Sequence, residues 1–186
     1  MLLRRPARFD LAIKLQQGGA TIGEVYSFIS GLYFRGKMAY VDAFSGGPAG
    51  VPPALIMVPG AGLVPPDTRV TEDQLRATAG IPVDEANHAY RDALLRAARL
   101  LDQHAGPACE HVLLGSIASA KYTAPLIEVF RHRLVFPADF VGRGDMSRGG
   151  LMLRCARTGV ELSYIPVLGA VRHGARPPKL QPWPKR

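Results

Sequence analysis

Hydrophobic positions along the chain follow two periods, one typical of strands and one typical of helices. Short apolar runs between turn residues predict strands, and apolar residues recurring every three or four positions predict helices with one buried face. The clearest helix covers residues 84–104, where seven apolar residues recur with this spacing. We expect strands over residues 9–15, 54–58, 111–115, 134–136 and 161–167. We expect further helices after Thr21, over residues 33–44, from residue 71, and over residues 123–130 and 147–157.

Strands that alternate with helices are typical of βαβ units. We therefore expect a three-layer α/β/α fold with a mainly parallel sheet, similar to a Rossmann fold. A chain of 186 residues is long enough for one core, so we expect a single domain over residues 1–174. Residues 175–186 form a basic, proline-rich tail that we expect to be disordered or extended.

Positive charge is concentrated at the two ends of the chain. The formal net charge is +8; residues 1–8 and 170–186 hold eight Lys and Arg, and the other 15 are matched by 15 Asp and Glu. A basic end can bind nucleic acid through its phosphates. It can equally be a solubilising tail.

Composition excludes several classes of protein. The chain is 47% hydrophobic and 20% charged, which is typical of globular proteins. No apolar run is long enough to predict a membrane span, and no apolar stretch follows Arg5 as in a secretory signal. Cys109 and Cys155 stand alone, so we expect no disulfide framework, metal or cofactor. These features favour the cytoplasm and leave the oligomeric state open.

The glycine-rich segment 140–150 is the strongest candidate site. It lies between a predicted strand and a predicted helix, where backbone amides and basic side chains can bind an anion. Asp145 is a candidate catalytic base or acceptor for a ribose hydroxyl, or a cap of the following helix. The candidate anion-binding residues are Gly142, Arg143, Gly144, Ser147 and Arg148.

Two other loops also follow predicted strands. The carboxyl ends of parallel strands meet at one edge of a sheet, so we expect all three loops to converge there. The alternative is that these residues have only structural roles. Gly60 and Gly62 would then form a tight turn, Ser116 and Ser119 would bond local backbone, and Lys121 would be solvated. The candidate residues of these two loops are Gly60, Gly62, Gly115, Ser116, Ser119, Lys121 and Tyr122.

An aromatic and basic cluster lies at residues 33–37. Tyr33 and Phe34 are suited to stack on a base, and Arg35 and Lys37 are suited to contact phosphate. The alternative is a packing turn with two exposed basic residues.

Short motifs across most of residues 20–155 carry a family resemblance. They are Glu24–Tyr26, Tyr33–Arg35, Gly62–Asp67, Leu113–Gly115, Lys121–Tyr122, Pro125–Leu126, and Gly142 with Gly144. The pattern resembles a group of uncharacterised bacterial proteins related to the peroxide-stress protein YaaA. The resemblance implies an α/β fold and a role connected with nucleotides or nucleic acids.

Three hypotheses for function follow. The first is a protein that binds a nucleotide or nucleobase, and whose Asp145 could act on an N-glycosidic bond. The second is a non-catalytic module that binds nucleic acid through its basic ends. The third is a scaffold or partner-binding protein, which needs no pocket.

Overall fold

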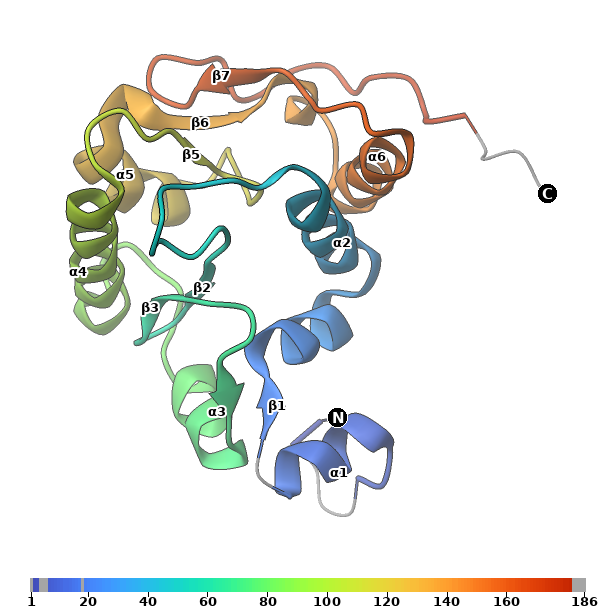
Figure 1. Cartoon of the computed structure of the whole chain (residues 1–186), viewed down its shortest axis with the longest axis vertical. Coiled ribbons are helices and arrows are strands. Elements are labelled where there is room, and N and C mark those ends of the chain that lie inside the picture. The colour runs from blue at the N-terminus through green and yellow to red at the C-terminus, as the bar shows by residue number, and fades with distance from the viewer. Residues whose placement is uncertain (1, 4–6, 18, 182–186) are drawn as a thin grey trace.

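Helices contribute more of the structure than strands do. The computed structural model describes residues 2–3, 7–17 and 19–181 (Figure 1). The helices are α1 (Asp10–Gln16), α2 (Ile22–Phe44), α3 (Glu72–Ala79), α4 (His88–Ala105), α5 (Ala120–Phe130) and α6 (Asp145–Thr158). The strands are β1 (Ala20–Thr21), β2 (Ile56–Val58), β3 (Gly62–Val64), β4 (Arg69–Val70), β5 (His111–Val112), β6 (Leu134–Pro137) and β7 (Tyr164–Pro166). Two short 3-10 helices flank β6, at Arg131–Arg133 and Ala138–Phe140.

The strands form three small sheets in the described part of the chain. β1 pairs with β4 and β2 with β3, both antiparallel, and the order of the third sheet is β5-β6-β7. Within that sheet β5 and β6 are parallel, whereas β6 and β7 are antiparallel. The expected three-layer, mainly parallel, Rossmann-like fold is therefore wrong.

The β2–β3 hairpin explains the largest part of this error. The apolar run at residues 54–58 suggested a central parallel strand, but the chain turns back at once. Gly60 and Gly62 have φ of +76° and +82°, which glycine adopts readily, and Val58 pairs with Gly62. An apolar run shows that a strand is buried but does not specify its partner or their relative direction.

Residues 9–15 were also predicted wrongly, as a strand. Phe9 is the N-cap of α1 and the other residues belong to this helix, whose buried residues Ala12 and Leu15 are three positions apart and lie on one helical face. The apolar and polar residues of this short segment fit either period, and the contact with β1 and α2 favours the helix.

Several helix ends follow their local signals. The helix predicted after Thr21 begins with a capping box formed by Thr21 and Glu24, and Gly159 ends α6 in the left-handed conformation. α4 begins at His88 and not at the predicted residue 84, because its cap is Asn87, whose side chain accepts from the Tyr90 amide. α2 bends at Gly31, which has φ of 53° and ψ of −128°.

The helix predicted to begin at residue 123 begins at Ala120, so Pro125 lies in the second turn of α5. Proline has no N–H, so it leaves the carbonyl of Lys121 without its helical donor. The hydroxyl of Tyr90 donates to this carbonyl over 3.1 Å, which ties α4 to α5.

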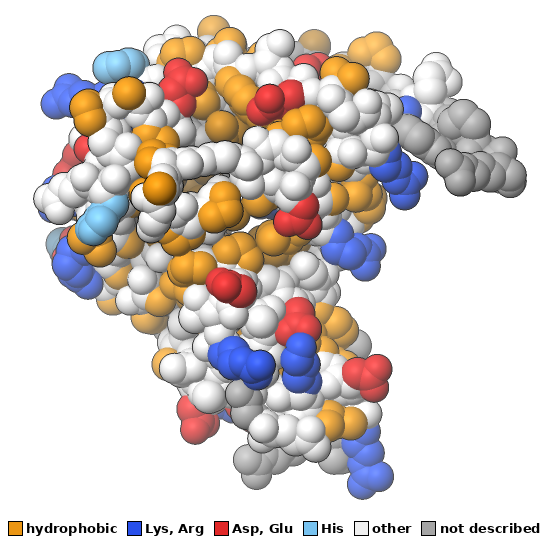
Figure 2. All heavy atoms as spheres, in the orientation of Figure 1, with side chains coloured by type: hydrophobic (Ala, Val, Ile, Leu, Met, Phe, Trp, Pro, Cys, Tyr) orange, Lys and Arg blue, Asp and Glu red, His pale blue; other side chains and the backbone are white. Residues whose placement is uncertain are grey.

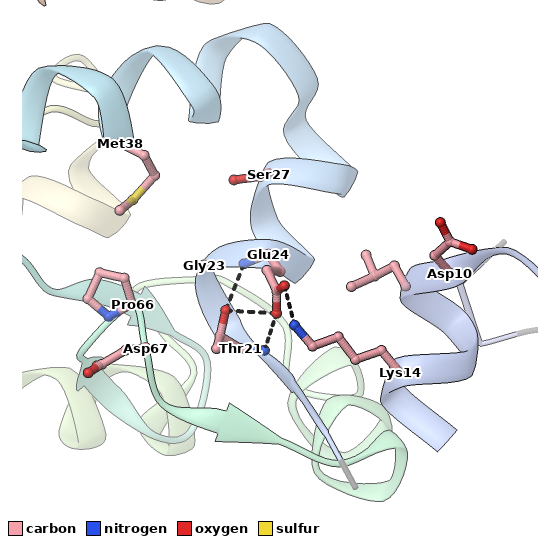
Figure 3. A pocket seen from close by; sticks show the side chains of 10 residues that line it. Asp10, Lys14, Thr21, Gly23, Glu24, Ser27, Met38, Pro66 and Asp67 are labelled. Atoms are coloured by element: carbon pink, nitrogen blue, oxygen red, sulfur yellow. Dashed lines mark hydrogen bonds and ion pairs between the residues drawn. The ribbon is translucent and has the colours of Figure 1, made fainter. Parts of the chain in front are cut away.

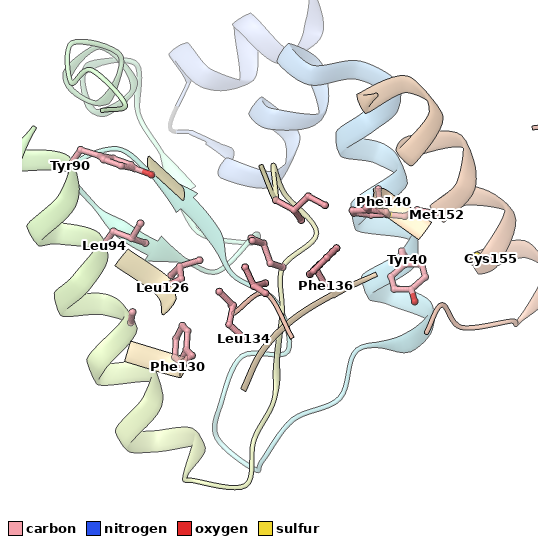
Figure 4. Close-up of a cluster of buried hydrophobic side chains, with 14 residues drawn as sticks. Tyr40, Tyr90, Leu94, Leu126, Phe130, Leu134, Phe136, Phe140, Met152 and Cys155 are labelled. Carbon is pink, nitrogen blue, oxygen red and sulfur yellow. The ribbon is translucent and has the colours of Figure 1, made fainter. Parts of the chain in front are cut away.

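The main core lies between α4 and the pair formed by α2 and α6. Figure 4 shows the aromatic rings of Phe130, Phe136 and Phe140 spread across this core. Each of these rings is at most 2% exposed. A second cluster, which includes Leu15, Val25, Ile56 and Leu75, joins α1, α2, β2 and α3.

Two glycines set the crossing of α2 and α6. A Cβ added at Gly36 would lie 2.5 Å from the Gly149 carbonyl oxygen, and one added at Gly149 would lie 2.8 Å from the Tyr33 Cα. The two backbones therefore touch at a point where no side chain fits. This crossing places the residues after Gly31 in α2 beside the first turn of α6.

The chain after β7 is extended and follows α6. The Ala175 carbonyl oxygen packs against Gly142, and Leu180 lies beside Gly150. Four of the eight basic residues at the two ends of the chain, at positions 4, 5, 185 and 186, lie outside the described residues. Within the described part of the chain, none of the helices has the length and apolarity to cross a membrane.

Candidate functional site

A cavity of about 600 Å³ lies between α2, α5, β2 and β5. Its wall includes the second half of α2 and the glycine- and proline-rich segment 44–57 that leads from α2 to β2. In the space-filling view, hydrophobic side chains gather across the middle of the face shown (Figure 2). A cavity of this size is typical of sites for small organic molecules.

Six tyrosines line the cavity, and the hydroxyls of four of them, Tyr33, Tyr40, Tyr90 and Tyr164, form hydrogen bonds. The Tyr33 hydroxyl donates to the Leu114 carbonyl over 3.2 Å, and the Tyr90 hydroxyl is held by α5. Burial raises the pKa of Tyr26 and Tyr33, and raises the pKa of Tyr90 to about 12. Tyr122 lines the same cavity, so the wall presents several phenol rings suited to contact a flat ligand.

Lys37 is the cation inside this aromatic wall. Its Nζ lies 4.1 Å from the centre of the Tyr33 ring and 5.7 Å from that of Phe34. Burial lowers the pKa of Lys37 to about 8; nearby Asp145 opposes this shift, and Arg148 adds to it. Among the described residues, no carboxylate lies within 4.0 Å of this amine. The site therefore presents a positive charge that its own acids do not pair closely.

Asp145 and Arg148 reach this region from α6. Asp145 lines the cavity with a side chain that is 67% exposed, and its Oδ1 lies 4.0 Å from Arg148 Nη1. Gly144 is the cap of α6 and Asp145 is its first residue, so the capping role considered for Asp145 is wrong. Arg148 is buried, and its Nε and Nη2 donate to the Phe140 carbonyl over 3.2 and 2.9 Å.

The other polar residues of the glycine-rich segment bond within their own loop. Arg143 Nε donates to the Asp139 carbonyl over 2.9 Å, and Nη1 donates to Ser147 Oγ over 3.3 Å. Gly142 has φ of +72° and packs closely on the Ala175 carbonyl. The conformation of this glycine thus serves the packing of the chain after β7.

The structure brings part of the predicted site together. The predicted residues that line the cavity are Tyr33, Lys37, Gly115, Ser116, Tyr122 and Asp145. Those that lie outside its lining are Arg35, Gly60, Gly62, Ser119, Lys121, Gly142, Arg143, Gly144, Ser147 and Arg148. Gly115, Ser116, Tyr122 and Asp145 were expected at the edge of one mainly parallel sheet, which the structure does not have. Tyr33 and Lys37, predicted as a separate cluster, lie near Asp145 because α2 crosses α6.

The candidates outside the lining have local roles. Gly60 and Gly62 form the tight turn of the β2–β3 hairpin, and a Cβ at Gly62 would lie 2.6 Å from the Ala93 carbonyl oxygen. Ser119 caps α5 without a side-chain bond, and Lys121 Nζ lies 5.3 Å from the centre of the Tyr122 ring. Arg35 is exposed.

The hydroxyl groups of Tyr40 and Tyr164 form a hydrogen-bonded chain in the cavity wall that the sequence does not predict. The Leu162 amide donates to Tyr40 Oη over 2.9 Å, and Tyr164 donates to Glu161 over 2.7 Å. Tyr40 therefore donates to Tyr164 Oη, which is 2.6 Å away. Because 124 positions separate the two tyrosines, no local pattern indicates this contact.

His111, at the start of β5, also lines the cavity, although the sequence indicates no functional role for it. Its ring lies 4.0 Å from that of Phe130, between centres. Its Nε2 is buried and has no hydrogen-bond partner in the described structure. Burial lowers the pKa of His111, and Arg133 adds to this effect while Asp102 opposes it.

A second hollow, of about 650 Å³, lies where α1 meets the start of α2 (Figure 3). Its main charged groups bond one another, because Lys14 pairs with Glu24 and Glu24 also accepts from the Thr21 amide over 2.8 Å. Asp67 lies on the opposite side, beside Pro66 (Figure 3). Thr21 and Glu24 are thus engaged in capping α2, and Lys14 is paired with Glu24, which makes this hollow the weaker candidate.

The described residues contain no group of three or more His, Cys, Asp or Glu side chains arranged to hold a metal ion. Comparison with protein-family models, curated proteins and solved structures finds no match to this chain. The resemblance to the YaaA-related group therefore stays a hypothesis that depends on the sequence motifs alone.

Proposed function

We propose that the protein binds a nucleotide or a related ligand, one flat ring carrying an anionic group, in the cavity beside Lys37. The observation that carries this proposal is the amine of Lys37, which lies close to the Tyr33 and Phe34 rings and has no carboxylate within 4.0 Å among the described residues. A ligand that combines an aromatic ring with a phosphate complements both features.

The wall offers a separate contact for each part of such a ligand. The base stacks on the tyrosine rings, which accept any base because every base has a flat face. Lys37, with the charge of Arg148 nearby, attracts the phosphate. Asp145 at the exposed side accepts hydrogen bonds from ribose hydroxyls.

The dimensions favour a free nucleotide over a polymer. A volume of about 600 Å³ lies within the range that single small molecules occupy. Residues of α2, of the segment 44–57 and of β5 surround it, which suits one enclosed ligand better than a continuous strand.

The position of Asp145 favours binding over turnover. A general base usually lies in a site whose burial and neighbours adjust its proton affinity. The Asp145 side chain is 67% exposed, which leaves it mainly in contact with water. We therefore propose a binding role, with Asp145 as a ligand contact rather than as the base of N-glycosidic cleavage.

Thermal unfolding with AMP, adenosine and inorganic phosphate tests the proposal. A ligand at 100 times its Kd stabilises the folded state by about 2.7 kcal/mol, so AMP should raise Tm by several degrees. Adenosine and phosphate should each raise it less, because each fills one part of the site.

Two lysine variants complete this experiment. Lys37→Met should lose the advantage of AMP over adenosine, whereas Lys121→Met, outside the cavity lining, should keep it. The proposed site would be contradicted if none of the three ligands changed the Tm of the original protein. It would also be contradicted if Lys37→Met bound AMP as tightly as the original protein does.

A further inference from the structure

We propose that Lys37 is a nucleophilic amine that forms an imine with a small aromatic aldehyde entering the cavity. This inference goes beyond nucleotide binding, because it needs neither a phosphate nor a ribose. It assigns a covalent chemistry to Lys37 and names an aromatic aldehyde as the class of ligand.

The geometry holds the amine in an enclosed and aromatic place. Lys37 follows Gly36, whose backbone touches α6, so the base of its side chain is fixed by the helix crossing. Its Nζ lies over the Tyr33 ring at 4.1 Å, and the side chain is half-buried. The face of the Tyr33 ring attracts the protonated amine, but burial removes water from that cation and outweighs this attraction, which favours the neutral, nucleophilic form.

The charged groups that face Lys37 come from α6, while the rest of its setting is phenolic. Asp145 favours the protonated amine and Arg148 disfavours it, so the two oppose each other. On α2 the neighbour is the Tyr33 phenol, and α5 contributes Tyr122 to the same cavity. Burial prevails, and the pKa of Lys37 falls to about 8.

This pKa makes the reaction accessible near neutral pH. At pH 8 about half of Lys37 is neutral, whereas an ordinary lysine with a pKa near 10.4 is less than about 1% neutral. The unprotonated amine is the form that attacks a carbonyl group.

The reaction requires no oxidant, metal or further cofactor. The nitrogen lone pair attacks the carbonyl carbon, and the C=O electron pair moves to oxygen to give a carbinolamine. Both hydrogens of the neutral amine then leave with that oxygen as one water molecule, and a C=N bond replaces the C=O bond. The aromatic ring of the aldehyde meanwhile contacts the tyrosines of the wall.

Reductive trapping with pyridoxal, a flat aldehyde without phosphate, tests the inference. Borohydride reduces an imine to a stable secondary amine, which intact-mass and peptide-mass measurements then locate. The sequence has five lysines. At pH 8 and low pyridoxal concentration, we expect one adduct per chain, on the peptide that contains Lys37.

Two lysine variants and the pH dependence of labelling test whether the adduct forms at Lys37. Lys37→Arg should lose at least about 90% of the adduct, while Lys121→Arg should retain it. In the unmodified protein, labelling of Lys37 should reach half of its maximum near pH 8. Labelling spread evenly over the lysines, or half-maximal labelling of Lys37 above pH 10, would overturn the inference without depending on how any variant folds.

The trapping result is separable from nucleotide binding. Adduct formation at Lys37 without any AMP effect on Tm supports the imine and contradicts the nucleotide. AMP binding that requires Lys37, with no adduct there, supports the nucleotide and overturns the imine.

Discussion

Replacing Lys37 with Met should stabilise the folded protein at neutral pH, although it removes the charge on which the proposed site depends. The folded state lowers the pKa of Lys37 from 10.5 to about 8, chiefly by burial. At pH 7 the amine is charged in both the folded and the unfolded chain, so folding carries the cost of burying that charge. Met keeps a long apolar side chain and avoids this cost.

The size of the stability difference between Lys37→Met and the original protein depends on pH. Between pH 8 and 10.5 the unfolded chain binds more protons at this residue than the folded protein does, so stability rises with pH. The two pKa values give a gain of about 2.5 kcal/mol for Lys37 between pH 7 and pH 10. The advantage of Lys37→Met over the original protein should therefore shrink by about that amount across this interval.

Urea unfolding at pH 7 and pH 10, with both proteins measured under the same conditions, provides the assay. Comparing the two proteins cancels other groups that titrate over this range, including cysteines and tyrosines. Lys121→Met, which removes a half-buried lysine outside the cavity lining, is the matched control. A variant less stable than the original at pH 7, or a difference that is the same at both pH values, would refute the reasoning.

Two other substitutions test the packing that forms the site. Gly149→Ala should destabilise the protein by about 1–3 kcal/mol in urea unfolding, because its Cβ would lie 2.8 Å from the Tyr33 Cα. Gly144→Ala, with no atom within 4 Å of the added Cβ, should cost less than about 1 kcal/mol; equal losses would contradict this account. Tyr164→Phe should cost about 1–2 kcal/mol by removing the acceptor of Tyr40, and an unchanged unfolding midpoint would argue against that bond.

Features set by neighbouring residues could be predicted from the sequence. The capping box of α2 needs only Thr21 and Glu24, and the end of α6 needs only a glycine at residue 159. The prediction of a parallel sheet was wrong because the direction of a strand depends on which other strand it pairs with. Ile56–Val58 pairs with Gly62–Val64 a few residues later, and β7 pairs with β6 in the antiparallel sense.

The candidate site was predicted in part, and for a reason that proved wrong. Tyr122 and Asp145, from two of the loops expected to converge, do line one cavity, but no shared edge of a parallel sheet brings them there. Tyr33 and Lys37, predicted as a separate cluster, join them because α2 and α6 touch at Gly36 and Gly149. The sequence shows both glycines without showing that they touch. In the same way, it shows glycines at 142–150 that suggest a ligand loop, whereas Gly149 packs against α2.

The central claim is that the charge of Lys37 holds the anionic part of a ligand in the cavity. Calorimetric titration with AMP at pH 7 and pH 9.5 tests it most directly, because Lys37 loses its proton between these values while the phosphate stays ionised. The affinity of the original protein should fall by about tenfold or more, in line with the loss of protonated lysine. Lys37→Met should bind weakly at both pH values. Affinity that is equal at both pH values in the original protein, or AMP binding by Lys37→Met as tight as the original, would contradict the claim.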